Sequence, residues 1–117
     1  MSGRVLIVEH DPVIATDLFI AVEDLGFEPV GPAVTAKEGL DFAERETLGA
    51  ALLDCVMMGE TSEAVAKALA ARGTPFLYVT GLEDPAALTR SWPDAPVLAK
   101  PLGPADLRQA LHALMRA

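Results

Sequence analysis

The stretch that most constrains the fold is residues 48–59, LGAALLDCVMMG, in the middle of the chain. Its apolar run, Ala50–Leu53, is short and lies between turn-forming residues. Such a run is typical of a strand buried on both faces of a parallel sheet. It ends at a carboxylate, Asp54. Ligands bind outside the carboxyl ends of the strands in open α/β sheets, so we expect Asp54 at a functional edge.

Three other strand-like runs also end at residues that can do chemistry. These residues are Glu9, His10 and Asp11 after residues 5–8, Thr80 after residues 76–79, and Lys100 after residues 97–99. The carboxyl ends of parallel strands meet at one edge of a sheet. Three acidic groups, a hydroxyl and a lysine should therefore gather at that edge.

Helical patterns separate the strand-like runs. Asp11-Pro12 offers an N-cap followed by a proline at the first helical position, and Gly26 is placed to end that helix. Thr35 and Glu38 form a possible capping box for a second helix that extends to about residue 46. Further helices are expected over 61–72, between Asp84-Pro85 and Trp92-Pro93, and after Gly103-Pro104. The run 27–33 contains two prolines, which predicts an irregular or edge strand.

Five strand–helix units in series predict a flavodoxin-like, doubly wound α/β fold, (βα)5, with right-handed crossovers. The expected parallel sheet has five strands in the order 2-1-3-4-5. A (β/α)8 barrel would need about twice this chain length. We expect residues 1–117 to form one domain.

Composition excludes several classes of partner. The net charge is −8 and the pI is near 4.5, which argues against nucleic acid and anionic membranes. No stretch approaches 18 consecutive apolar residues, so no membrane span is expected. The single cysteine cannot form an internal disulfide, and this favours a cytoplasmic location.

The residue types at the predicted edge suit phosphoryl transfer. Asp54 can act as a nucleophile toward phosphorus, and neighbouring carboxylates provide the oxygen ligands that Mg²⁺ prefers. Lys100 could stabilise charge on the phosphoryl oxygens, and the Thr80 hydroxyl could donate a hydrogen bond.

The sequence resembles the CheY-like receiver domains of bacterial response regulators over essentially its whole length. The resemblance rests on VLIVEHDP near the N-terminus, LLDCVMMG in the middle, VTG at 79–81 and LAKPL at 98–102. It implies that Asp54 is the phosphoacceptor, with Thr80 as the switch hydroxyl and Lys100 as the active-site lysine. It also implies that Glu9, Asp54 and the carbonyl of Val56 hold Mg²⁺, and that the Lys100–Pro101 peptide is cis.

By this resemblance the chain is expected to be a stand-alone receiver in a two-component, histidine-to-aspartate phosphorelay. Its partners would be a sensor histidine kinase or histidine phosphotransfer protein, and a downstream protein target. A second copy of the chain is a further candidate partner. No output domain and no enzyme activity are expected, apart from phosphorylation and dephosphorylation of Asp54 itself.

Three positions depart from the receiver pattern, namely His10, Val97 and Met58, the last of which stands four residues after Asp54 where the family commonly has proline. His10 stands where the family has a metal-binding aspartate, and imidazole is a poor ligand for Mg²⁺ and a better one for Zn²⁺, Mn²⁺ or Cu²⁺. Val97 stands where receivers often carry the aromatic residue that moves on activation. The first departure weakens the expected Mg²⁺ site, and the second weakens the usual signalling movement.

Other functions remain open. His10 supports a pseudo-receiver, an interaction module that does not depend on phosphorylation. An aspartyl-nucleophile phosphatase of the haloacid dehalogenase type would need an aspartate two residues after Asp54, where this chain has Val56. A flavodoxin-like flavin site is disfavoured because the first strand–helix loop is acidic and would repel a phosphate.

Overall fold

The computed structural model describes residues 3–57, 59–81, 86–100 and 102–115. Its strands are β1 (Arg4–Val8), β2 (Glu28–Ala33), β3 (Ala50–Leu53), β4 (Val56–Met57), β5 (Glu60–Thr61), β6 (Phe76–Thr80) and β7 (Val97–Ala99). Its helices are α1 (Pro12–Asp24), α2 (Ala36–Arg45), α3 (Glu63–Ala71), α4 (Ala86–Thr89) and α5 (Pro104–Met115).

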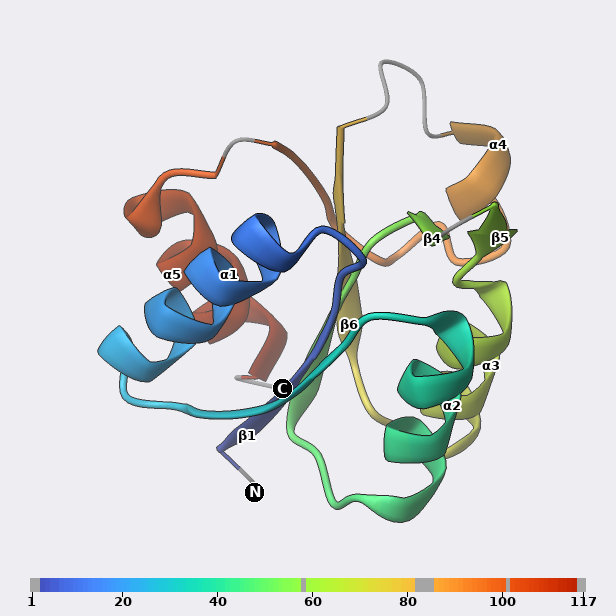
Figure 1. The fold of residues 1–117 in the computed structure, drawn as a ribbon, viewed down its shortest axis with the longest axis horizontal. Helices are drawn as coiled ribbons and strands as arrows, with labels where there is room; N and C mark the ends of the chain where they lie inside the picture. Colours follow the sequence, from blue (N-terminus) through green and yellow to red (C-terminus); the bar gives the residue numbers. More distant parts are fainter. Residues whose placement is uncertain (1–2, 58, 82–85, 101, 116–117) are drawn as a thin grey trace.

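The main sheet is parallel and has the strand order β2-β1-β3-β6-β7. Counted along this sheet alone, the order is 2-1-3-4-5, so the predicted doubly wound α/β fold is confirmed. Helices α1 and α5 cover one face, and α2 and α3 cover the other (Figure 1). The three central strands β1, β3 and β6 therefore lie between two helical layers.

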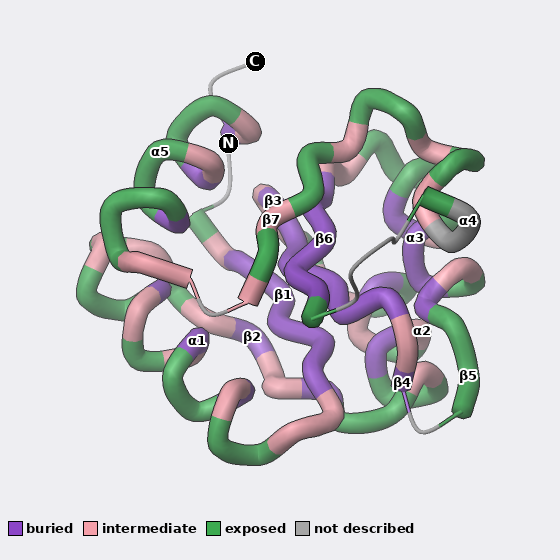
Figure 2. The backbone as a smooth tube through the Cα atoms, turned by 90° about the horizontal axis from the view of Figure 1, so that it is seen from above, coloured by how far each residue is buried: buried purple, intermediate pink, exposed green. Residues whose placement is uncertain are grey.

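The core consists of two apolar clusters, one on each face of the sheet. Side chains alternate between them along β1, β3 and β6, so Leu6 and Val8 belong to one cluster and Val5 and Ile7 to the other. All four residues of β3 are buried, as expected for a strand covered on both faces. Figure 2 shows buried backbone concentrated in these central strands.

Helix ends follow the predicted signals. The Asp11 carboxylate accepts hydrogen bonds from the backbone N–H groups of Val13 and Ile14 at 2.9 and 3.4 Å, and Pro12 is the first residue of α1. The Thr35 hydroxyl accepts a hydrogen bond from the Glu38 N–H at 3.1 Å. Gly26 and Gly73 follow α1 and α3 with positive φ angles of 91° and 70°. The two predicted helix starts are confirmed.

Strand β2 lies at one edge of the sheet, as its prolines predict. Its pairing with β1 shifts register between Leu6 and Val8, opposite Gly31 and Pro32. Gly31 has a φ of 102°, and an added Cβ would lie 2.8 Å from the Ala33 nitrogen. The bend at Gly31 therefore requires glycine.

The small hairpin of β4 and β5 was not predicted. It occupies residues 56–61, which precede a helix that begins at Glu63 rather than at 61. The sequence feature that indicates this hairpin is Gly59, which has a positive φ of 85°. The predicted end of the fourth helix before Trp92-Pro93 is confirmed, because α4 ends at Thr89. The expected helix cap at Asp84-Pro85 and the expected cis peptide at Pro101 involve residues outside the described part of the chain.

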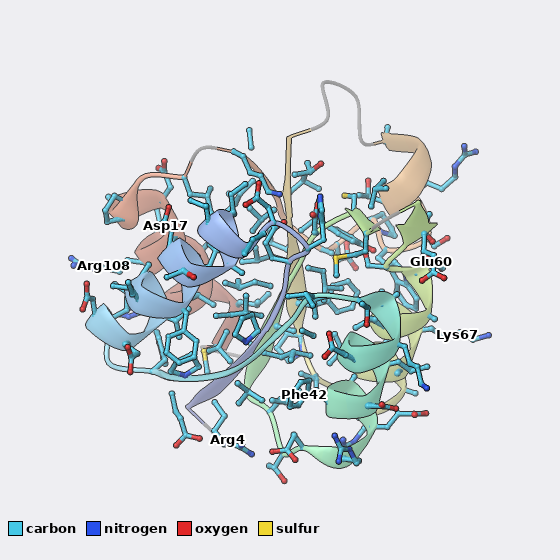
Figure 3. The ribbon with its side chains drawn as sticks, viewed as in Figure 1. Arg4, Asp17, Phe42, Glu60, Lys67 and Arg108 are labelled. Carbon is cyan, nitrogen blue, oxygen red and sulfur yellow. The ribbon has the colours of Figure 1, made fainter. Side chains whose placement is uncertain are left out.

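Charged side chains project from the outer helical surfaces, as Lys67 on α3 and Arg108 on α5 illustrate (Figure 3). Among the described residues, no helix has the length and apolar character needed to cross a membrane.

Candidate functional site

Strand register brings the predicted site residues to one edge of the sheet. Val8 pairs with Leu53 across β1 and β3, so the next residues, Glu9 and Asp54, are neighbours. Thr80 ends β6 and pairs with Ala99 of β7, and Lys100 follows directly. Backbone hydrogen bonds continue the sheet past the strand ends, from Asp54 N–H to the Val8 carbonyl and from Lys100 N–H to the Thr80 carbonyl, each at 2.9 Å.

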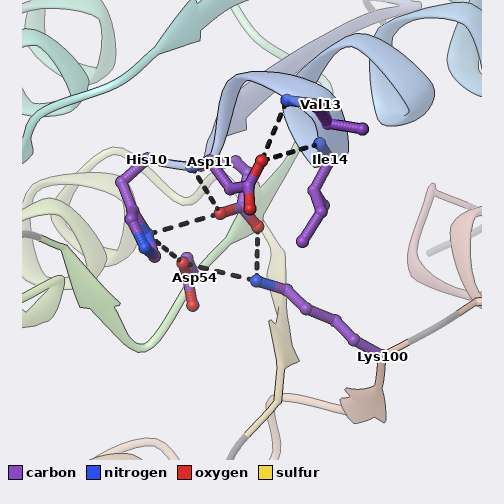
Figure 4. Close-up of polar contacts among 7 residues, drawn as sticks. His10, Asp11, Val13, Ile14, Asp54 and Lys100 are labelled. Carbon is purple, nitrogen blue, oxygen red and sulfur yellow. Dashed lines mark hydrogen bonds and ion pairs between the residues drawn. The ribbon is translucent and has the colours of Figure 1, made fainter.

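The side chains of Glu9, Asp54 and Lys100 form a buried ion-pair cluster (Figure 4). Lys100 Nζ lies 2.6 Å from Glu9 Oε1 and 3.4 Å from Asp54 Oδ2. Glu9 is fully buried and Asp54 is 5% exposed. Two carboxylates and one ammonium group thus share a site largely withdrawn from water.

His10 points into the same cluster. Its Nδ1 lies 2.8 Å from Asp54 Oδ2 and 3.4 Å from Glu9 Oε2. The side chain of His10 is 38% exposed, so the imidazole stands between the buried carboxylates and solvent. The sequence places His10 beside the site, but it did not predict the direct contact with Asp54.

Asp11 caps helix α1 with its side chain and contacts Glu9 through its backbone. Its carboxylate is used to cap α1, and its backbone N–H donates to Glu9 Oε2 at 3.1 Å. Asp11 therefore helps to orient Glu9 through its backbone. Its Oδ1 accepts both capping hydrogen bonds.

Burial shapes the electrostatics of the cluster. Loss of solvation raises the pKa of the Glu9 carboxyl above its ordinary value, and the hydrogen bonds from Lys100 and the Asp11 N–H offset only part of this. Burial also raises the pKa of the Cys55 thiol, while a hydrogen bond with the Thr80 hydroxyl acts in the opposite direction. A buried thiol with a raised pKa has little of the thiolate character that makes a cysteine reactive.

A cavity of about 510 Å³ opens above the cluster. Its lining includes His10, Asp11, Asp54, Val56, Thr80 and Lys100. A second cavity of about 570 Å³ lies between α1 and α5 and shares Ile14 and Lys100 with the first. The Asp54 carboxylate is thus buried at its base and reachable from one side.

Three residues of the cluster could hold a metal ion. Glu9, His10 and Asp54 each offer one ligand atom, and these atoms all lie within 4.8 Å of one another. Val56, the expected carbonyl ligand, lines the same cavity. The structure brings together every residue predicted for the metal and phosphoacceptor sites.

Similarity to known proteins agrees with this arrangement. No protein-family model matches the chain. The chain is 31% identical to the phyllosphere-induced regulator PhyR of Methylorubrum extorquens over 111 residues, and this match covers 92% of the chain. The match spans 41% of the length of that relative.

Solved structures resemble the whole chain. SdrG from Sphingomonas melonis Fr1 is 41% identical with a TM-score of 0.85, and the match covers 98% of this chain and 99% of that one. SdrG in its BeF3-activated conformation is 38% identical with a TM-score of 0.80, covering 97% and 96%.

Two further structures show the same fold. A CheY-like response regulator receiver domain protein from Methanospirillum hungatei JF-1 is 28% identical with a TM-score of 0.88, covering 99% of this chain and 95% of that one. The PA1611 receiver domain from Pseudomonas aeruginosa PAO1, which has a magnesium ion in its active site cleft, is 22% identical with a TM-score of 0.87 and full coverage of both chains. This chain belongs to the CheY-like receiver domains of response regulators.

Proposed function

We propose that this receiver accepts a phosphoryl group on Asp54 in a histidine-to-aspartate phosphorelay. The observation that carries the proposal is the buried cluster of Glu9, Asp54 and Lys100 at the base of an open cavity. A carboxylate that is shielded at its base and reachable from one side can serve as a nucleophile. The nearby ammonium group can stabilise negative charge on the incoming phosphoryl oxygens.

The reaction transfers a phosphoryl group and needs no other reactant besides the donor. A carboxylate oxygen of Asp54 attacks phosphorus, the phosphorus–nitrogen bond of a phosphohistidine donor breaks, and an acyl phosphate forms on Asp54. Lys100 would exchange its contact with Asp54 for one with the phosphoryl oxygens, and the hydroxyl of Thr80, which lines the same cavity, would donate a hydrogen bond to them. Hydrolysis of the acyl phosphate by water returns free Asp54 and inorganic phosphate, so the only turnover is self-phosphorylation and self-dephosphorylation.

The carboxylates and the carbonyl at this site suit a divalent cation. Glu9, Asp54 and the Val56 carbonyl would hold it, and when bound it offsets the repulsion between the carboxylates and the phosphoryl group. The magnesium ion of the PA1611 receiver domain supports a cation in the equivalent cleft. The imidazole of His10 is the one donor that does not suit Mg²⁺.

The phosphorylated form would signal through contacts with other proteins. Its donor would be a sensor histidine kinase or a histidine phosphotransfer protein, and its target a downstream protein or a second copy of the chain. The BeF3-activated conformation known for SdrG supports a response to a phosphoryl-like group. The lone cysteine, buried and unpaired, suits a reducing cytoplasm.

A pseudo-receiver is the second candidate, and one observation favours it. Asp54 already contacts both His10 and Lys100, so two groups of this chain satisfy its charge without a cation. In that case the chain would bind its partner without phosphorylation. The phosphatase alternative has no observation in its favour, because Val56 offers no carboxylate.

Chemical trapping distinguishes the two candidates. The protein is treated with acetyl phosphate and a divalent cation, reduced with borohydride, and mapped by peptide mass spectrometry. Reduction converts an aspartyl phosphate to homoserine, which we expect at Asp54 only. Homoserine at another aspartate would contradict the assignment of Asp54, and homoserine at none with any cation would favour the pseudo-receiver.

A further inference from the structure

We propose that His10 makes this site select a transition-metal dication, with Zn²⁺ as the model ion, over Mg²⁺. The inference deepens the proposed function and rests on it for the role of the bound cation. It assigns His10 as the residue that determines metal specificity. The ligands would be Glu9, His10 and Asp54.

All three ligand atoms lie within 4.8 Å of one another, and His10 Nδ1 is close to both carboxylates. His10 Nδ1 lies 3.4 Å from Glu9 Oε2 and 2.8 Å from Asp54 Oδ2. Ligands bound to Zn²⁺ at about 2.0–2.2 Å in a tetrahedron lie roughly 3.3–3.5 Å apart. The Glu9–His10 spacing meets this value, and the His10–Asp54 contact needs to open by only about half an ångström.

The donor types favour zinc over magnesium. Mg²⁺ requires near-octahedral oxygen ligands and retains several waters, whereas imidazole suits Zn²⁺, Cu²⁺ and Ni²⁺. Two carboxylates and one imidazole leave a fourth zinc position open, which is the arrangement found where zinc binds a reacting group. The cavity above Asp54 gives that fourth position access to a phosphoryl oxygen.

The charge around the site also favours Zn²⁺ over Mg²⁺. The carboxylates of Glu9 and Asp54 contact Lys100 Nζ at 2.6 and 3.4 Å, and this ammonium group offsets part of their negative charge. A hard ion such as Mg²⁺ depends on that negative charge for its binding. Zn²⁺ gains a nitrogen bond from His10 that Mg²⁺ gains only weakly.

Metal titration of the free protein tests the proposal without any phosphodonor. Zn²⁺ and Mg²⁺ affinities are measured by calorimetry for wild type, His10→Asp, His10→Ala and His112→Ala. The chain has two histidines, so His112→Ala is the matched control, and its exposed position on α5 is far in sequence from the cluster. Co²⁺ serves as a spectroscopic substitute for zinc, because its visible absorption reports nitrogen ligation and coordination number.

We expect the preference of wild type for Zn²⁺ over Mg²⁺ to exceed that of His10→Asp at least tenfold, or about 1.4 kcal/mol. His10→Ala should weaken Zn²⁺ binding more than Mg²⁺ binding and change the Co²⁺ spectrum, and His112→Ala should do neither. Equal preference in wild type and His10→Asp, or loss of binding in His112→Ala, would overturn the proposal. Circular dichroism of each variant verifies that the fold is retained.

Different results would contradict the metal specificity of His10 and the phosphoacceptor role of Asp54. Trapping of phosphate at Asp54 with unchanged metal preference in His10→Asp would contradict the metal assignment alone. His10-dependent zinc binding without any label on Asp54 would contradict the phosphoacceptor role alone.

Discussion

At the scale of single residues, the burial of Glu9 makes the stability of the protein depend on pH. It is fully buried beside a second carboxylate, and one lysine contacts both. Its pKa is raised, so the folded state holds the proton of Glu9 more tightly than the unfolded chain does. The favourable contribution of Glu9 is therefore fully present below its unfolded pKa and is lost as pH rises through the folded pKa.

We predict that Glu9→Gln is more stable than wild type at neutral pH when metal is removed by a chelator. Glutamine keeps the shape of the protonated side chain and carries no charge to desolvate. The gain should shrink as pH falls below the ordinary carboxyl range. Urea unfolding from pH 3 to 8 measures it, with Glu60→Gln on the exposed hairpin as a charge-matched control. A variant less stable than wild type at pH 7 would show that the ion pair with Lys100 outweighs burial.

Tyr78 offers a second test at this scale. Its hydroxyl is buried and has no hydrogen-bond partner in the part of the chain that the structure describes, and burial raises its pKa. An unpaired buried hydroxyl costs about 1–3 kcal/mol. Tyr78→Phe keeps the edge-to-face contact with Phe76 at 5.8 Å and removes the hydroxyl.

Tyr78→Phe should therefore raise the free energy of unfolding by about 1 kcal/mol. Tyr78→Leu, which also loses the ring contact, should lower it. Chemical denaturation compares the three proteins. A clear loss of stability in Tyr78→Phe would mean that the hydroxyl is satisfied, for example by a bound water.

At the scale of elements, β7 is the part expected to respond least to phosphorylation. Val97 pairs with Tyr78 across β6 and β7 and is 40% exposed. Valine is β-branched and has few χ1 states, so it cannot reproduce the large ring movement expected of an aromatic residue here. The movement should be concentrated around Thr80 and Gly81, where glycine gives the backbone freedom.

We expect beryllofluoride to shift amide NMR signals strongly at 54–56 and 80–81, and weakly over β7 and α5. Asp54→Asn should show no such shifts. Val97→Tyr, which introduces the ring, should extend the shifts into β7. Equally large shifts across Val97–Ala99 and α5 in wild type would show that the response spreads without an aromatic residue.

Elements were predictable where a local signal decides their ends. Asp11-Pro12 fixes the start of α1, because an Asx cap and a proline act through their own backbone. The β4–β5 hairpin was missed because its strands are two residues each and carry no periodicity. The delayed start of α3 follows from it, since Thr61 is used in the hairpin.

At the scale of the whole molecule, the site follows from topology. Parallel strands with helical crossovers bring Glu9, Asp54 and Lys100 together although 91 positions separate the first from the last. Alternation of strand and helix was therefore enough to predict which residues meet. This alternation could not predict that His10 points toward Asp54. The rotamer of a partly exposed side chain depends on its neighbours in three dimensions, and the sequence pattern does not reveal how these are arranged.

We propose that Asp54 is the phosphoacceptor of this chain. The most direct test is intact-mass analysis after treatment with acetyl phosphate. Wild type and Asp54→Asn are incubated with acetyl phosphate and either Mg²⁺ or Zn²⁺, and their intact masses are measured before and after mild hydrolysis. We expect one labile phosphoryl group of about 80 Da on wild type and none on Asp54→Asn, as an acyl phosphate on a single carboxylate requires. Equal labelling of the two proteins, or no labelling of wild type with either ion, would contradict this proposal.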